Sequence, residues 1–407
     1  MSTKKNFNFQ KNKTLQLLSD SGNKAICYGG YRLKDRAVVP TRQQQFEDLK
    51  IMAAMGVKFI RTYNVHLPEA AQLLECIKEL KAQDNNFEMN VMLGAWIDCK
   101  NAWTNMPVDH DEESDENKVE IAKAVELTRK YPDIVKIISV GNEAMVKWAT
   151  AYYVQPRFIL KWVNHLQDLK KQSDLSQDLL ITSSDNFASW GGGDAEYHNH
   201  DLEQLIRAVD YISIHTYPMH DTHYNPSFWG LEGINYEKNK EQQTRMLMKQ
   251  ALDYAVSQYN SVKKYVDKIA KNKPIHIGET GWATMDHDKY GNKGSKATDE
   301  FKSGMYYDLI TKWCQQNNMA CFYFEAFDEH WKDSYNAQGS ENHFGLFTMD
   351  GKAKYALWDM VDQGKFKGLT RDGYAITKSL NGDKQALLEK IELPLRTQKM
   401  QKATTNN

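Results

Sequence analysis

The feature that most constrains this chain is a regular alternation of short apolar runs with longer amphipathic segments. Eight runs rich in Val, Ile, Phe and Tyr recur, at residues 24–32, 57–64, 88–98, 135–143, 179–185, 210–218, 273–282 and 320–329. Segments of helical period follow them, at residues 43–56, 68–83, 116–132, 157–172, 201–209, 241–271, 300–318 and 355–363. Such alternation is typical of βα units around a parallel sheet. Eight units predict an α/β fold of the (β/α)₈ TIM barrel type.

The predicted barrel takes most of the 407 residues. It spans residues 24–363, within the range of about 200 to more than 400 residues that such barrels reach with insertions. Residues 1–23 form a predicted N-terminal extension. Residues 364–407 form a short C-terminal extension, whose polar end at 395–407 is expected to be disordered. The prediction is one catalytic domain with an extension at each end.

Two segments between the predicted elements have unusual compositions. Residues 219–240, after the sixth strand, are too many for a routine βα connection and are rich in aromatic side chains. This extended loop is expected to wall a cleft, because loops at this end of a barrel carry function, and a disordered insertion is the alternative. The acidic run DHDEESDE at 109–116 is expected to be a solvated loop.

The charge balance restricts the class of substrate. Lysine plus arginine number 52 against 53 for aspartate plus glutamate, and no segment concentrates basic residues in a stripe. There is no electrostatic case for nucleic acid, so a neutral substrate is expected. No run reaches the ~18 apolar residues of a membrane span, so no transmembrane segment is predicted. No pattern in the chain predicts an oligomeric state.

Two glutamates stand at the carboxyl ends of predicted strands, where barrel active sites are built. Glu143 ends the fourth strand in SVGNEA, and Glu279 ends the seventh in HIGETGW. Cleavage of a glycosidic bond with retention needs one carboxyl to protonate the leaving oxygen and another to attack the anomeric carbon, about 5 to 5.5 Å apart. One strand-end glutamate is more often a capping or ion-paired residue, but two at one barrel mouth favour catalysis.

Other chemistries lack their motifs. The histidines of HNH (198–200) and HDTH (220–223) suggest a metal site, but neither shows the helical HExxH spacing, so no metal is predicted. No GxSxG elbow occurs, and no GxGxxG or GxxxxGK[ST] motif follows a strand. His215, at the end of the sixth strand, is expected to donate a hydrogen bond or satisfy a carboxylate rather than to act as acid or base.

Several motifs together resemble glycoside hydrolase family 17. They occur in the family's order as CYGGY (27–31), IRTYN (60–64), VGNE (140–143), IHTYP (214–218), GETGW (278–282), FEAFDEHWK (324–332) and ENHFGLF (341–347). That family contains β-1,3-glucanases, β-1,3-1,4-glucanases and β-1,3-glucanosyltransferases. The resemblance, which covers residues 24–358, implies a retaining mechanism with Glu143 as acid/base, Glu279 as nucleophile and no metal or organic cofactor.

Further residues are expected to bind the sugar. Four match polar strand-end positions of the family, with a hydrogen-bonded core residue as the alternative for each tyrosine: Tyr28, Tyr63, Asp185 and Tyr217. Asn142, directly before Glu143, carries an amide that can donate to a sugar hydroxyl near the reacting carbon. Four tryptophans at or after strand ends are candidate sugar platforms, Trp96, Trp103, Trp282 and Trp331. Of these, Trp282 and Trp331 are the preferred candidates.

A group of charges near the eighth strand is expected to support the nucleophile. Glu329, Lys332 and Glu341 resemble a charge network of the family, in which the positive charge of Lys332 would hold Glu279 ionised. A purely structural ion pair is the alternative. The chain departs from the family pattern at His276, Ala283 and His330, which affects substrate detail more than mechanism.

The predicted function is retaining hydrolysis of a laminarin-type β-1,3-glucan by double displacement, with endo action. The alternatives are a β-1,3-glucanosyltransferase, in which a second sugar replaces water as acceptor, and a non-catalytic β-glucan-binding protein. The binding protein is disfavoured because both glutamates are present. A polymeric substrate implies an extracellular or periplasmic location, although residues 1–20 lack the apolar region of a signal peptide.

Overall fold

Eight parallel strands close into a barrel in the computed structural model of the chain, which describes residues 12–234 and 238–394. The strands are β1 (Lys24–Cys27), β2 (Val57–Arg61), β3 (Asn90–Ala95), β6 (Val135–Asn142), β7 (Leu180–Asn186), β8 (Ile212–His215), β9 (Ile275–Thr280) and β10 (Cys321–Tyr323). They follow one another around the barrel in chain order, and β10 closes it against β1. Seven lie within the runs predicted as strands and β7 extends one residue beyond its run, so the (β/α)₈ barrel is confirmed.

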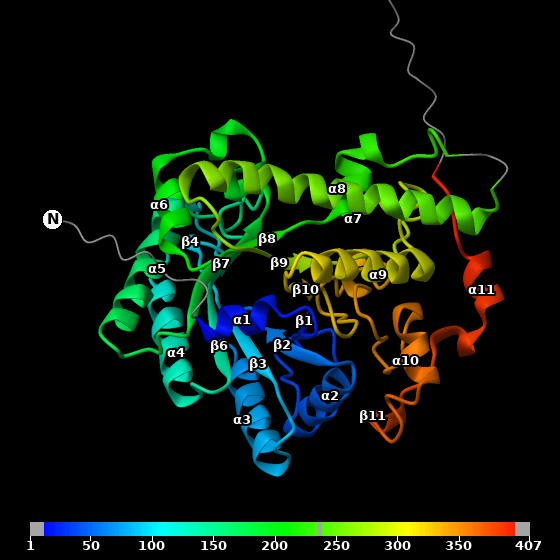
Figure 1. Cartoon of the computed structure of the whole chain (residues 1–407), viewed down its shortest axis with the longest axis horizontal. Helices are drawn as coiled ribbons and strands as arrows, with labels where there is room; N and C mark the ends of the chain where they lie inside the picture. Colours follow the sequence, from blue (N-terminus) through cyan, green and yellow to red (C-terminus); the bar gives the residue numbers. More distant parts are fainter. Residues whose placement is uncertain (1–11, 235–237, 395–407) are drawn as a thin grey trace, which may run out of the picture.

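Helices surround the barrel on its outside (Figure 1). They are α2 (Arg42–Ala54), α3 (Pro68–Gln83), α4 (Glu116–Lys130), α5 (Pro156–Lys171), α6 (His200–Ala208), α8 (Lys240–Ile269), α9 (Glu300–Gln316) and α10 (Trp358–Asp362). In α3 the residues that turn inward recur at helical spacing, for example Leu73, Ile77 and Leu80, and all three are buried. Pro68 occupies the first turn, where its missing N–H costs no hydrogen bond. The amphipathic pattern therefore fixes which helix face meets the strands.

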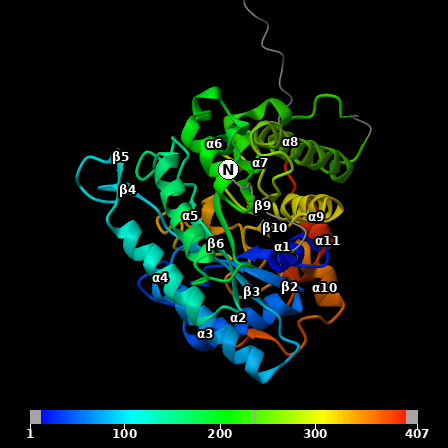
Figure 2. The same cartoon turned by 60° about the vertical axis from the view of Figure 1, so that its left-hand side comes forward.

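A hairpin follows β3 and projects from the body of the barrel (Figure 2). Its strands are β4 (Cys99–Lys100) and β5 (Asp109–Glu113), paired antiparallel. The expectation of a solvated loop at 109–116 is therefore wrong for residues 109–113. Glu113 supplies the reason, because its carboxylate accepts a hydrogen bond from Trp162 Nε1 at 2.7 Å and ties the hairpin to α5.

The long connection after β8 is folded where the structure describes it. It begins with α7 (Pro218–Tyr224) and continues in a short 3₁₀ helix (Pro226–Phe228). His220, Asp221, Tyr224 and Asn225 line a cleft at the barrel mouth, so the expectation that this loop walls a cleft is confirmed and the disordered alternative is wrong for residues 218–234. Residues 235–237 lie outside the described part.

Segments at both ends of the chain pack onto the barrel. In α1 (Lys13–Ser19), Leu15 and Leu18 join the core. After the barrel, the hairpin of β11 (Thr370–Arg371) and β12 (Tyr374–Ala375) and the helix α11 (Lys384–Glu389) return along it (Figure 1). The disorder expected at 395–407 falls outside the described residues, and the division at residues 23 and 363 stays a prediction.

Asp48 on α2 joins the C-terminal segment to the barrel. Its buried carboxylate accepts hydrogen bonds from Arg371 Nε at 3.0 Å, from Arg32 Nη1 at 2.6 Å and from the Tyr28 hydroxyl at 3.0 Å. The side chains of Arg371 and Asp48 are both fully buried. Because a buried charge is tolerated only when it is paired and hydrogen-bonded, this cluster fixes β11 against α2.

Replacement of Arg371 by methionine, which keeps much of its volume but removes its charge, should lower the free energy of unfolding by about 3 kcal/mol. Arg42→Ala is the matched control, because Arg42 forms exposed ion pairs with Glu75 and Glu79 and should change stability by no more than about 0.5 kcal/mol. Urea unfolding followed by circular dichroism measures both. Equal midpoints for the two variants would show that the buried pair does not hold the segment.

Candidate active site

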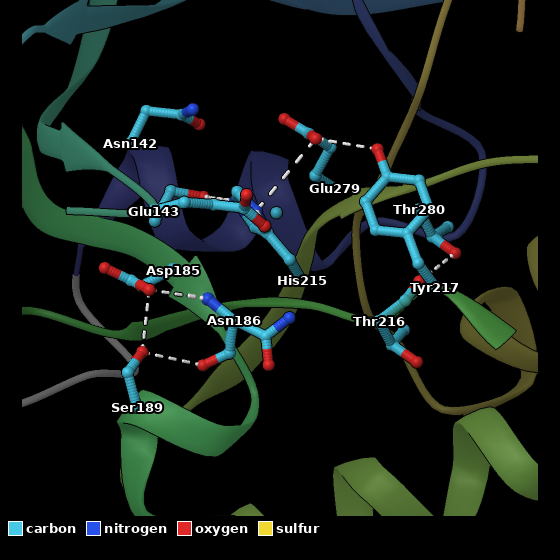
Figure 3. A network of polar contacts seen from close by, with 12 residues as sticks. Asn142, Glu143, Asp185, Asn186, Ser189, His215, Thr216, Tyr217, Glu279 and Thr280 are labelled. Atoms are coloured by element: carbon cyan, nitrogen blue, oxygen red, sulfur yellow. Dashed lines mark hydrogen bonds and ion pairs between the residues drawn. The ribbon is translucent and has the colours of Figure 1, made fainter. Parts of the chain in front are cut away.

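Glu143 and Glu279 meet at the carboxyl end of the barrel, on either side of His215 (Figure 3). His215 Nδ1 lies 3.0 Å from Glu143 Oε1 and 4.0 Å from Glu279 Oε1. Two carboxylates that approach one ring nitrogen this closely are compatible with the separation of about 5 to 5.5 Å that retention requires. The contact with Glu143 also agrees with the expectation that His215 satisfies a carboxylate.

Glu279 is a buried carboxylate surrounded by donors. Its Oε2 accepts hydrogen bonds from Arg61 Nη1 at 2.7 Å and from the Tyr63 hydroxyl at 2.9 Å, and its Oε1 accepts one from the Tyr217 hydroxyl at 2.7 Å. Burial would raise the pKa of Glu279, but His215, Arg61 and the two hydroxyls outweigh it and lower the pKa to about 2. Glu279 is therefore held ionised, as a nucleophile must be.

Arg61, at the end of β2, is the functional residue that sequence reasoning missed. Its buried guanidinium bonds Glu279 through Nη1 and Asn142 Oδ1 through Nη2 at 2.5 Å. A guanidinium can only donate, so it fixes the amide oxygen of Asn142 and leaves the amide nitrogen free to donate. The IRTYN motif places an arginine at a strand end, but only the closed barrel shows that its partners lie on β6 and β9.

Glu143 follows β6 in a left-handed turn. Its φ is 47°, and the preceding Gly141 has a φ of 82°. A non-glycine residue in this region costs free energy, so the surroundings must hold it there. Glu143 N–H donates to Ser184 O at 3.0 Å, and Met145 N–H donates to Asp185 Oδ2 at 2.8 Å.

Asp185 supports this turn from beneath and does not line the cleft. Besides Met145, it accepts hydrogen bonds from Asn186 N–H at 2.8 Å and from the Ser189 hydroxyl at 2.7 Å (Figure 3). Its side chain is fully buried, and burial raises its pKa to about 6. The expectation that Asp185 touches substrate is corrected, since its oxygens are engaged by the protein and it positions the segment that carries Glu143.

The charge network near β10 is present with one different member. Lys332 Nζ lies 2.8 Å from Glu325 Oε2 and 3.5 Å from Glu329 Oε2. Burial opposes the charge of Lys332, but Glu325 and Glu329 raise its pKa above the ordinary value. Glu341 lies elsewhere, with Oε1 3.8 Å from His220 Nε2. The expected network of Glu329, Lys332 and Glu341 is therefore corrected, with Glu325 in the place of Glu341.

A cleft crosses the barrel mouth in two lobes that meet at Glu279. The first lobe is lined by Glu143, Trp148, Asn186, Phe187, Tyr217, His220, Tyr224 and Tyr290. The second lobe is lined by Tyr28, Tyr63, Asn64, Trp96, Asp98, Trp103, Asn142, Tyr152, Trp331 and Lys332. Glu279, Phe324 and Glu341 line both lobes. The structure thus brings the two glutamates, Asn142, Tyr63 and Tyr217 together.

Trp282 is the clearest correction among the expected sugar contacts. Its side chain is 0% exposed, packs against Trp229 and Tyr306, and donates from Nε1 to Ala297 O at 2.8 Å. It is a core residue and lines neither lobe. Trp331 does line the second lobe, but the guanidinium of Arg36 lies 4.5 Å from its ring centroid and covers part of the ring.

Tyr28 has a position between these cases. It lines the second lobe, yet its side chain is buried and its hydroxyl is bound to Asp48.

Within the residues that the structure describes, no three His, Cys, Asp or Glu side chains are grouped to hold a metal ion. Over the same residues, no helix is long and apolar enough to cross a membrane.

Comparisons with known proteins agree with this geometry. A model of the BtgE/BtgC glycoside hydrolase domain matches residues 25–345. An endo-laminarinase from Formosa Hel1_33_131 has a structure that superposes with a TM-score of 0.93 at 59% identity, covering 95% of this chain and 98% of that one. The family 17 β-1,3-glucanosyltransferase of Rhizomucor miehei, at 18% identity and a TM-score of 0.57 over 83% of this chain and 97% of that one, shares the fold.

Two fungal relatives share about a quarter of their aligned residues with this chain. The glucan 1,3-beta-glucosidase of Arthroderma benhamiae is 25% identical over 77% of this chain and 84% of its own length. The btgC protein of Aspergillus niger, which is named as a glucan endo-1,3-beta-glucosidase, is 24% identical over 74% of this chain. The matched region spans 37% of that Aspergillus protein.

Asp185→Asn tests the support beneath the turn that carries Glu143. The substitution replaces one carboxylate oxygen by an NH₂ group, which donates and cannot accept. The N–H of Met145, or else the N–H of Asn186 together with the Ser189 hydroxyl, would then lose its acceptor. We expect a loss of about 1 to 3 kcal/mol in unfolding free energy and a drop in kcat of about tenfold to a hundredfold with little change in KM. Ser189→Ala, which removes one donor, should have a smaller effect. Wild-type kcat in Asp185→Asn would rule out the positioning role.

The depressed pKa of Glu279 also predicts how stability depends on pH. Its pKa is about 2 in the folded chain against an ordinary 4.5, so its charge contributes stability above pH ~4.5 that is lost as the pH falls toward 2. Glu279→Gln lacks this contribution at every pH. The difference in unfolding free energy between wild type and Glu279→Gln should therefore shrink, by on the order of 3 kcal/mol, between pH 6 and pH 2. A difference that stays constant in urea titrations would contradict the assigned ionisation.

Proposed function

The chain belongs to the BtgE/BtgC glycoside hydrolase domain family, and from this we propose that it is a retaining endo-acting hydrolase of laminarin-type β-1,3-glucan. The single observation that carries the mechanism is the unequal treatment of two carboxylates at one barrel mouth. Glu279 is buried among three donors, whereas the side chain of Glu143 is 28% exposed and faces the first lobe. Environments that differ in this way separate an ionised nucleophile from a proton donor.

The reaction follows from this pair in two displacements. Glu279 attacks the anomeric carbon while Glu143 gives its proton to the glycosidic oxygen, so the bond to the leaving sugar breaks and a glycosyl ester forms on Glu279. Glu143, now a carboxylate, takes a proton from a water molecule that attacks the same carbon. The bond to Glu279 breaks, and the product keeps the original configuration.

The two lobes indicate in which direction the substrate chain runs through the site. Glu143 must reach the leaving oxygen, and it lines the first lobe, so the leaving part of the chain lies there. Asn142 lines the second lobe and has a free amide nitrogen for a hydroxyl of the sugar that is attacked. The glycon part of the substrate therefore lies in the second lobe. A cleft that continues on both sides of Glu279 supports cleavage inside a chain rather than at its end.

The substrate class rests on the relatives together with the charge of the cleft. The Formosa protein, which shares 59% identity over nearly the whole chain, is named an endo-laminarinase. The cleft combines aromatic side chains with hydrogen-bonding groups, as recognition of a neutral sugar requires. Transfer to a sugar in place of water uses the same two glutamates, and the Rhizomucor relative is named a glucanosyltransferase, so transfer is the second candidate activity.

Incubation with laminarin and with single laminari-oligosaccharides tests the proposal, with products followed by chromatography. Internal cleavage should release oligosaccharides of mixed length early in the reaction. Products longer than the starting oligosaccharide would identify transfer instead. If neither laminarin nor the oligosaccharides change, the β-1,3-glucan assignment is wrong.

Glu279→Ala supplies the mechanistic control for this experiment. It should lose at least about a thousandfold in kcat, because no ester can form, and azide should restore part of the turnover on an activated substrate with an inverted glycosyl azide as product. Glu88→Ala removes an exposed carboxylate at the opposite end of β3 and should retain wild-type activity. Full activity in Glu279→Ala would exclude this residue as the nucleophile.

A further inference from the structure

Trp103 is a large apolar side chain held in solvent at the cleft. It lies between the two strands of the β4–β5 hairpin, which projects from the barrel (Figure 2). Its side chain is 63% exposed, and it lines the second lobe. The hydrophobic effect disfavours such a position, so the indole contributes little to the core. The exposed position of Trp103 is therefore not explained by a contribution to folding stability.

The protein holds this indole in one orientation. The ring stacks on Tyr152, with centroids 5.2 Å apart and planes inclined by 23°. Its Nε1 donates to Asp98 Oδ1 at 3.3 Å, and Trp96 Nε1 donates to the same oxygen at 2.6 Å. Asp98 thus fixes two indoles with one carboxylate oxygen, while Tyr152 packs beside both.

The backbone gives a second, independent sign. Trp103 has a φ of 60°, in the left-handed region that a bulky side chain rarely occupies. Strain of this kind persists only where the surroundings enforce it, and it concentrates at functional sites. An indole that is exposed, hydrogen-bonded, stacked on one side and carried on strained backbone is preorganised for a flat apolar ligand on its other face.

The remaining tryptophans of this lobe are less available. Trp331 has Arg36 over its ring, and Trp96 is only partly exposed beneath Tyr152. We propose that Trp103 is the sugar-stacking platform of an outer glycon subsite, which gives the enzyme its preference for longer β-glucan chains. The CH face of a pyranose packs on an aromatic face, and a preformed platform gains affinity without the cost of ordering a loop. The inference rests on the proposed function, because it places the glycon end in the second lobe.

The experiment compares kcat/KM for laminari-oligosaccharides of three to seven sugars in wild type, Trp103→Ala and Trp103→Phe. In wild type, kcat/KM should rise with length until the outer subsite is filled. Trp103→Ala should lower kcat/KM for the longest substrates about tenfold and flatten the rise, whereas Trp103→Phe should keep part of it because a flat ring remains. Tyr374→Ala is the matched control, since Tyr374 is an exposed aromatic on β12 that does not line the cleft, and it should keep the wild-type profile.

Binding measurements in a Glu279→Gln background separate affinity from turnover. Calorimetric titration with laminariheptaose should show weaker binding, again about tenfold, when Trp103→Ala is added. If wild type cleaves the series but Trp103→Ala keeps its length dependence and affinity, the platform is overturned while the proposed function stands. If wild type cleaves no laminari-oligosaccharide, both are overturned. Equal behaviour of the Phe and Ala variants would show that ring stacking is not the cause.

Discussion

The buried guanidinium of Arg61 is the interaction on which the rest of the site depends. A charge taken out of water at the end of β2 is stable only if partners surround it, and Glu279 and Asn142 are those partners. The same contacts act with His215 and the two tyrosine hydroxyls to lower the pKa of Glu279, and they fix the amide oxygen of Asn142. One buried cation therefore stabilises the charge of Glu279 and fixes the orientation of Asn142, so both side chains are organised before any ligand binds.

The closed barrel brings these side chains from separate strands together. Glu143 and Glu279 come from β6 and β9, with β8 and His215 between them, and parallel strands present all three side chains at one end. The barrel also separates their environments. Glu279 is buried among the Tyr63 and Tyr217 hydroxyls and the Arg61 guanidinium. Glu143 lies on a left-handed turn and lines the first lobe. Two identical side chains thus have different environments because their neighbours differ.

Periodicity was sufficient to predict the eight barrel strands and the helices between them, because it is a local property of the chain, and strand-end position together with the motifs pointed to the two glutamates. Exposure is not local. Trp282 ends the GETGW motif yet is covered by Trp229 and Tyr306, whereas Trp103, in an irregular stretch that matches no motif, is exposed. Arg61 was missed for a similar reason. Its importance comes from partners on β6 and β9, which are adjacent only after the barrel closes.

The C-terminal segment bears on the cleft although it lies outside the barrel. Arg371 pairs with Asp48, and Asp48 accepts a hydrogen bond from the hydroxyl of Tyr28, which lines the second lobe. Arg32, in the connection after β1, also donates to the carboxylate of Asp48. The wall of the second lobe is thus fixed by a residue near the far end of the described chain. A boundary drawn at residue 363 describes where the βα pattern stops, but the physical unit that shapes the second lobe extends at least to Arg371.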